Sequence, residues 1–82
     1  MGVPGDLRWD ERTVRIWYYV VEREGRWWVS RGMSHELINL PSVETALAYA
    51  DALARLLHET YQQPAGVRVA DHGRWRDAAT YG

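Results

Sequence analysis

The 82-residue chain contains no cysteine and no phenylalanine, and only three prolines. Without cysteine it can form neither a disulfide nor a thiolate metal site. A chain of this length is too short for two ordinary domains, so one hydrophobic core must hold it together. Five tryptophans and five tyrosines supply much of the apolar surface for that core.

Lysine is also absent, so all ten basic residues are arginine. Eleven acidic residues offset them and leave a formal net charge of −1, which lacks the basic excess typical of nucleic-acid-binding proteins. The first ten residues do not form the charged start and apolar run of a signal peptide, and no stretch comes near the roughly 20 apolar residues of a membrane span. We therefore expect a cytoplasmic protein without membrane association.

Runs of β-branched and aromatic residues favour the pleated surface of a sheet and predict the first two strands. The first strand is expected at residues 13–21, where every residue except Arg15 is β-branched or aromatic. The charged residues 22–26 follow and include Gly25, which can adopt a positive φ, so they predict a hairpin turn. The second strand is expected at residues 27–31.

Three later segments also have strand character. Residues 36–40 form either a third short strand or an extended connection to Pro41. A further strand is predicted at residues 67–70, where valine alternates with other residues. Residues 74–82 are either a final edge strand or a loop packed on the rest of the chain.

One helix is predicted between these strands, over residues 43–62. Ser42 is a good N-cap, Glu44 lies in the first turn where the helix dipole favours an anion, and Pro64 and Gly66 end the helix. At 3.6 residues per turn, one stripe collects Val43, Ala46, Leu47, Ala50, Leu53, Ala54, Leu57 and Tyr61. The small alanines on this stripe would let the helix axis lie close to a sheet.

The order of the elements predicts an α+β fold, β-β-(β)-α-β. We expect a three- or four-stranded antiparallel sheet with one helix packed on one face, forming a single domain at residues 13–82 after a flexible N-terminal arm at residues 1–12. One helix covers only one face of a sheet, and strand residues alternate between the faces. The other face should therefore present arginine and aromatic side chains. The residues predicted to form an interface there are Arg15, Trp17, Tyr19, Trp28 and Arg68.

The sequence leaves open what binds to this aromatic face. A second copy could stack on it to form a homodimer, or the ends of the chain could cover it with Trp9, Trp75 and Tyr81. A foreign protein could dock there, since tryptophan, tyrosine and arginine are enriched at interaction hot spots. Single-stranded nucleic acid could stack bases on the aromatic rings, with Arg15 and Arg68 contacting phosphate, but the near-neutral charge makes this less favourable.

A second possible interface is predicted on the helix, beside the buried stripe. It consists of Tyr49, Leu53 and Leu56. These residues either contact the C-terminal tail or form a seam between the helices of two copies.

No catalytic residue, metal ligand or cofactor site is predicted. His35, His58 and His72 lie in separate segments and form no pair of metal ligands. The neighbours Asp71 and His72 are expected to point apart at a strand end, without a nucleophile beside them. No glycine-rich phosphate loop, carboxylate pair or nucleophile elbow is present, so an enzyme is not expected.

The pattern Gly25-Arg26-Trp27-Trp28-Val29, the alanines of the helix, and residues 67–70 followed by His72-Gly73 resemble a small uncharacterised bacterial beta-beta-alpha-beta family, domain of unknown function 2188. The same strand-turn-strand-helix order more distantly resembles the HicB-like antitoxins. We expect a non-enzymatic interaction or regulatory module that associates with itself through the aromatic sheet face. A single-stranded nucleic-acid-binding or antitoxin-like regulator, from a phage or other mobile element, is the alternative.

Overall fold

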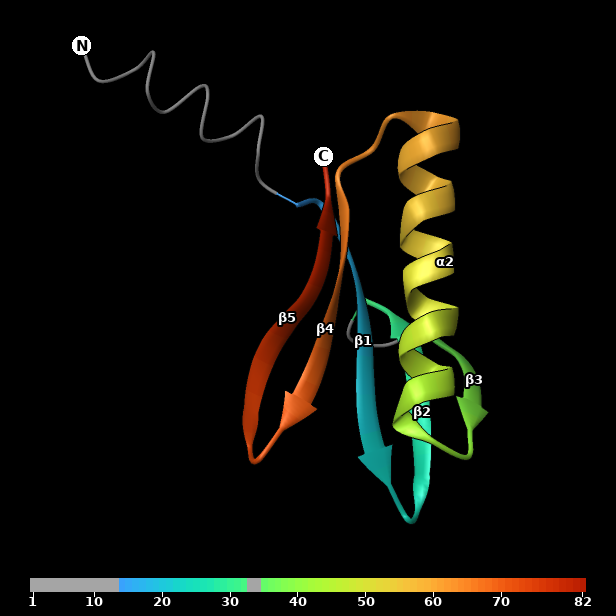
Figure 1. The fold of residues 1–82 in the computed structure, drawn as a ribbon, viewed down its shortest axis with the longest axis vertical. Helices are drawn as coiled ribbons and strands as arrows, with labels where there is room; N and C mark the ends of the chain where they lie inside the picture. Colours follow the sequence, from blue (N-terminus) through green and yellow to red (C-terminus); the bar gives the residue numbers. More distant parts are fainter. Residues whose placement is uncertain (1–13, 33–34) are drawn as a thin grey trace, which may run out of the picture.

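The computed structural model describes residues 14–32 and 35–82. They form a five-stranded mixed sheet with one helix on one face (Figure 1), which confirms the predicted α+β class. The predicted arm at residues 1–12 lies outside the described residues. The elements are β1 (Ile16–Arg23), β2 (Arg26–Arg31), β3 (His35–Leu40), α2 (Val43–Tyr61), β4 (Ala65–Asp71) and β5 (Arg74–Tyr81).

The strands lie in the order β3-β2-β1-β4-β5. The sheet has more strands than predicted, because both ambiguous segments, β3 and β5, are strands. It is also not wholly antiparallel, since β1 and β4 pair in parallel at its centre. The reason is the helical crossover: α2 carries the chain back along the sheet, so β4 starts at the same end as β1.

Two tight hairpins connect the central strands β1 and β4 to their neighbours β2 and β5. The turn between β1 and β2 has positive φ at Glu24 and Gly25, and the turn between β4 and β5 has positive φ at His72 and Gly73. Two consecutive residues with positive φ define a type I′ turn, whose twist matches that of the flanking strands. The hairpin predicted at residues 22–26 is confirmed.

The core lies between α2 and the sheet. Its fully buried residues include Val20, Val29 and Val67 from the three central strands. Opposite them, Ala46, Ala50 and Ala54 have no exposed surface, and their short side chains let α2 pack close to the sheet. The predicted alanine stripe is confirmed.

The ends of α2 agree with the prediction to within one residue. The Ser42 side chain accepts a hydrogen bond from the Thr45 backbone N–H at 3.2 Å, as an N-cap does. Tyr61, which was predicted on the buried stripe, is 66% exposed. It belongs to the last turn of α2, which extends beyond the end of the sheet (Figure 1).

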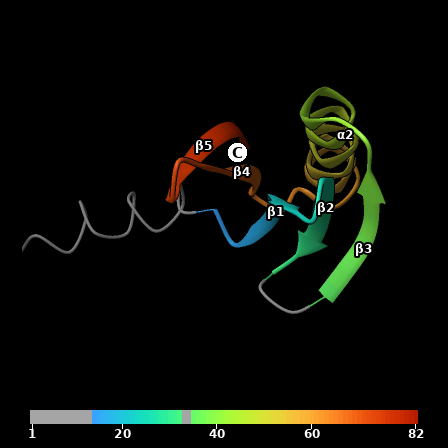
Figure 2. The ribbon, with the colours of Figure 1, turned by 90° about the horizontal axis from the view of Figure 1, so that it is seen from below.

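The two faces of the sheet differ. Figure 2 shows α2 on one face, and no helix or strand of the described residues covers the opposite face. Among the described residues there is also no helix with the length and hydropathy to cross a membrane. The uncovered face, called the outer face below, is where the predicted interaction residues of β1, β2 and β4 lie.

Candidate interaction surface

The register of the strands brings the side chains of the outer face together. Tyr19 in β1 lies between Ser30 of β2 and Arg68 of β4, and Val21 lies beside Trp28. Ala70 and Trp75 are paired between β4 and β5. Because paired residues of neighbouring strands share a face, the outer face carries an aromatic or arginine side chain on each of the four strands β1, β2, β4 and β5.

Trp17 and Arg68 form the first cluster of this face. The guanidinium carbon of Arg68 lies 3.7 Å from the centre of the Trp17 ring, a cation–π distance. Arg68 Nε also donates a hydrogen bond to Asp77 Oδ1 at 2.9 Å. This hydrogen bond raises the pKa of Arg68 above its ordinary value, so the guanidinium stays charged and held by its carboxylate.

Gly66 makes room for the Trp17 ring. A Cβ atom at this position would lie 2.7 Å from Cζ3 of Trp17 and 3.0 Å from the carbonyl oxygen of Ala79. Both distances are shorter than a normal van der Waals contact. The Trp17 ring therefore approaches the backbone of β4 so closely at Gly66 that a side chain there would displace it.

Trp28 and Arg23 form the second cluster. The guanidinium carbon of Arg23 lies 4.4 Å from the centre of the Trp28 ring, and Arg23 Nη2 contacts Glu36 Oε2 at 2.7 Å. Trp28 Nε1 donates a hydrogen bond to the Arg23 carbonyl oxygen at 3.3 Å. This cluster repeats the order of the first one: an aromatic ring, a stacked arginine and a carboxylate.

Tyr19 and Trp75 form the third cluster, and they contact each other edge to face. Their ring centres are 5.0 Å apart and the planes meet at 70°, the geometry that aromatic pairs prefer. Trp75 is 47% exposed, although it is the largest type of apolar side chain. It therefore projects from the outer face.

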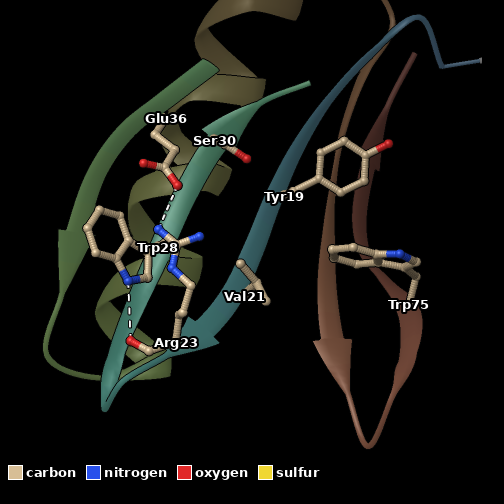
Figure 3. Close-up of a pocket in the computed structure, with 7 residues that line it drawn as sticks. All are labelled: Tyr19, Val21, Arg23, Trp28, Ser30, Glu36 and Trp75. Carbon is tan, nitrogen blue, oxygen red and sulfur yellow. Dashed lines mark hydrogen bonds and ion pairs between the residues drawn. The ribbon is translucent and has the colours of Figure 1, made fainter. Parts of the chain in front are cut away.

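A hollow of about 170 Å³ lies between the second and third clusters. Figure 3 shows Val21 between the two walls, with Tyr19 and Trp75 on one side and Trp28 on the other. Ser30, Arg23 and Glu36 complete the lining. The hollow can therefore accept an apolar side chain, with one charged pair at its rim.

The sequence analysis placed Trp17, Tyr19, Trp28 and Arg68 on one surface, and the structure brings these four to the outer face. Arg15 precedes β1, and its backbone N–H donates to the Pro64 carbonyl oxygen at 3.2 Å. It does not line the hollow.

The sequence analysis did not single out three charged residues of the outer face. They are Arg23, Glu36 and Asp77. Arg23 was assigned to a turn rather than to β1, and Glu36 and Asp77 lie in segments whose strand character was left open. Alternation from Tyr19 and from Trp75 would have placed Arg23 and Asp77 on the aromatic face. Glu36 reaches that face only through the bulge at Leu37, which alternation does not predict.

The second predicted interface, Tyr49, Leu53 and Leu56, lies on one flank of α2. Tyr49 is 36% exposed and Leu56 is 58% exposed, whereas Leu53 packs against the core. Contact of this flank with the C-terminal tail was one expectation, and it is wrong. The tail forms β5, which lies on the other side of α2.

The opposite flank of α2 is tied to β5 by polar contacts. The Tyr81 hydroxyl donates a hydrogen bond to Asp51 Oδ1, and Arg55 Nη2 lies 3.3 Å from Asp51 Oδ2. The hydrogen bond with the Tyr81 hydroxyl raises the pKa of Arg55 above its ordinary value. This flank is therefore already in contact with the protein's own last strand.

The three histidines lie far apart in the fold, in β3, in α2 and in the turn before β5. Within residues 14–32 and 35–82, no three histidine, aspartate or glutamate side chains are grouped so that they could hold a metal ion. Asp71 and His72 were expected to point apart, but His72 Nδ1 lies 2.7 Å from Asp71 Oδ1. The turn conformation folds the exposed imidazole back onto its neighbour.

No family model matches the chain, no curated protein matches it, and no solved structure matches it. The resemblances to domain of unknown function 2188 and to HicB-like antitoxins therefore stay predictions. Function has to be inferred from the surfaces described above.

Proposed function

We propose that this chain is a non-enzymatic protein-interaction module that associates with a second copy through its outer face. One observation carries the proposal: on the same face, the exposed side chain of Trp75 stands beside a hollow, of which it forms one wall with Tyr19. An interface with two-fold symmetry uses the same patch on both copies, so that patch must be complementary to itself. A face with a projection and a hollow meets this requirement.

The charges of the outer face support the same partner. Arg23 is paired with Glu36 on one side of the hollow, and Arg68 is paired with Asp77 further along β4 and β5. Each pair is neutral, so two such faces can approach without a net repulsion between like charges. A partner with a strong charge of either sign would gain little from this surface.

The best probe of the outer face is Trp75. Trp17 and Trp28 also lie there, but they are stacked under arginines, and their removal would disturb the sheet itself. We expect Trp75→Ser to halve the molar mass measured by light scattering over a concentration series, because each contact loses two projecting rings. Tyr61→Ser is the matched control, because Tyr61 is also an exposed aromatic residue but lies at the end of α2.

A folded Trp75→Ser variant that keeps the wild-type molar mass would contradict the proposal. A wild-type protein that is monomeric at all concentrations would also contradict it, and would leave the outer face to a foreign protein.

The alternative of single-stranded nucleic acid binding fits the outer face less well. The guanidinium groups of Arg23 and Arg68 are each held by a carboxylate, and each also covers a face of a tryptophan ring. Phosphate would have to displace the carboxylates, and bases would have to displace the guanidinium groups.

We therefore expect no binding of a fluorescent mixed-sequence single strand, even at about 50 mM salt, where phosphate contacts are strongest. Fluorescence anisotropy measures this directly. The variant Asp77→Asn releases Arg68 from its carboxylate and serves as the sensitised comparison. Micromolar binding by the wild type that weakens steeply with salt would favour nucleic acid as the partner.

A further inference from the structure

β3 forms one edge of the sheet and offers unpaired backbone groups, as β5 does at the other edge. β3 is the outermost strand and pairs only with β2. Alternate residues of such a strand direct their amide and carbonyl groups away from the sheet, where another strand can bind them. Leu37 is the extra residue of a bulge, with no partner in β2, since Val29 pairs with Ile38 and Ser30 pairs with Glu36.

An apolar strip of α2 runs beside this edge. Leu47 and Asp51 lie toward β5, as their contacts with Ala79 and Tyr81 show. At 100° per residue, Tyr49 and Leu56 fall on the other flank, on the side of β3. Figure 2 shows β3 at the rim of the sheet next to α2.

Exposed apolar side chains gather at this rim. Ile38 of β3 is 36% exposed, in addition to Tyr49 and Leu56 of α2, and Leu53 lies among them half-buried. We call these four residues the rim surface. Four of the six large apolar side chains that are exposed in the described residues belong to β3 or to this flank of α2: Leu37, Ile38, Tyr49 and Leu56. A monomer gains no stability from apolar side chains that are gathered on its surface and exposed to water.

β5, at the opposite edge, also offers unpaired backbone groups, but its side chains differ from those of β3. β5 carries the charged residues Arg74, Arg76 and Asp77, which oppose the addition of a strand. The flank of α2 above it is bonded to Tyr81 through Asp51 and shares a hollow with Ala78 and Ala79 of β5. The asymmetry identifies β3 as the edge suited to a partner.

We propose that the β3 edge and the rim surface bind a second copy of this chain about a two-fold axis, so that two five-stranded sheets join into one. The partner has to supply an edge strand and, next to it, an apolar helix flank. A second copy supplies both at matching positions, because antiparallel pairing of β3 with the partner's β3 brings the two α2 helices together on the same side of the sheet.

The charges fit this arrangement. With the pairing centred on Ile38, each Ile38 side chain meets the partner's Ile38 on the helix side. The bulge at Leu37 places Glu36 on the outer side, on the other face of β3 from Ile38, so its carboxylate lies away from the apolar helix side of the contact. Glu36 also keeps its own Arg23 at 2.7 Å on the outer side.

This inference is independent of the outer-face contact, since the two use different surfaces. If both contacts form, two joined sheets stack through their outer faces and give a tetramer with two kinds of two-fold axis. If only one forms, the protein is a dimer, and the variants below tell which contact holds it.

Leu56→Glu is the first test, because it places a carboxylate on the apolar helix flank of the proposed contact at a position that is exposed in a single copy. We expect it to raise the dissociation constant of the contact at least about tenfold, seen as a halved molar mass by light scattering. The matched control is Ala48→Glu, which adds the same charge to an exposed position of α2 away from the rim surface. It should keep the wild-type mass.

A crosslink distinguishes the β3 edge from the outer face. The chain has no cysteine, so Ile38→Cys introduces a single thiol next to its symmetry mate. Cβ atoms across a close strand pair are about 4.5 to 5.5 Å apart, near enough for a disulfide after a small shift. We expect mild oxidation to yield a covalent dimer of Ile38→Cys, to yield none of Ala48→Cys, and to yield none when Leu56→Glu is added.

The four possible results separate the two proposals. If Leu56→Glu and Trp75→Ser each lower the molar mass, both contacts are supported. A mass lowered by Leu56→Glu alone supports the β3 contact and contradicts the outer-face contact. A Leu56→Glu variant with the wild-type mass overturns the β3 proposal, whatever Trp75→Ser does. A wild-type monomer overturns both.

Discussion

Replacement of Gly66 by alanine is expected to lower the free energy of unfolding by about 1 to 3 kcal/mol, although it adds only one methyl group. The new Cβ would lie 2.7 Å from the Trp17 ring and 3.0 Å from the Ala79 carbonyl oxygen. The ring cannot move freely, because Arg68 is stacked on it at 3.7 Å. Thermal unfolding should show a fall in Tm of roughly 4 to 8 °C for each kcal/mol in a domain of this size.

A double-mutant cycle with Trp17→Ala provides the control for Gly66→Ala. Once the ring is removed, the added methyl group meets only the Ala79 carbonyl oxygen, so the cost of Gly66→Ala should fall. The coupling between the two substitutions measures the contact directly. Equal costs with and without the Trp17 ring would show that the ring does not lie across Gly66.

Replacement of Ala50 by leucine is expected to destabilise the protein by about 3 kcal/mol. Ala50 has no exposed surface, and it lies at the centre of the alanine stripe by which α2 contacts the sheet. Three further carbon atoms would have to push the helix away from Val20 and Val67, or force strained rotamers. Urea unfolding, monitored by circular dichroism, measures this change in the free energy of unfolding. It appears as a lower midpoint concentration of urea with an unchanged slope m.

Ala48→Leu is the matched control for Ala50→Leu. It introduces the same side chain two residues earlier in α2, at an exposed position. Its stability should stay within about 0.5 kcal/mol of the wild type. Equal stabilities of the two variants would mean that α2 does not lie close to the sheet at Ala50.

Much of the fold could be predicted from local patterns. The Ser42 cap and the absence of glycine and proline after it predicted α2 to within one residue at its C-terminal end. The helical period also predicted the alanine stripe. These features depend on residues within a turn or two of one another, so no knowledge of the remaining chain is needed.

β3 and β5, the two segments whose structure the sequence left undecided, have little strand character in their own residues. Only Ile38 and Leu40 of β3 have clear strand character on the helix side, and β5 mixes charged residues with alanine. Both strands exist because a neighbour provides hydrogen bonds: β2 for β3, and β4 for β5. Edge strands of this kind depend on their sheet more than on their own sequence.

The sequence by itself determined which residue types share a face. Alternation placed Trp17 and Tyr19 on one side of β1 and Tyr18 and Val20 on the other, because successive side chains of a strand point in opposite directions. Only the tertiary structure decided which strands became neighbours. The stack of Arg68 on Trp17 requires the parallel pairing of β1 with β4. These two strands are separated in the chain by β2, β3 and α2. The same is true of the rim surface, which exists because the crossover sets one flank of α2 beside β3. Contacts between distant segments depend on the free energy of the whole packed chain, and no local pattern encodes them.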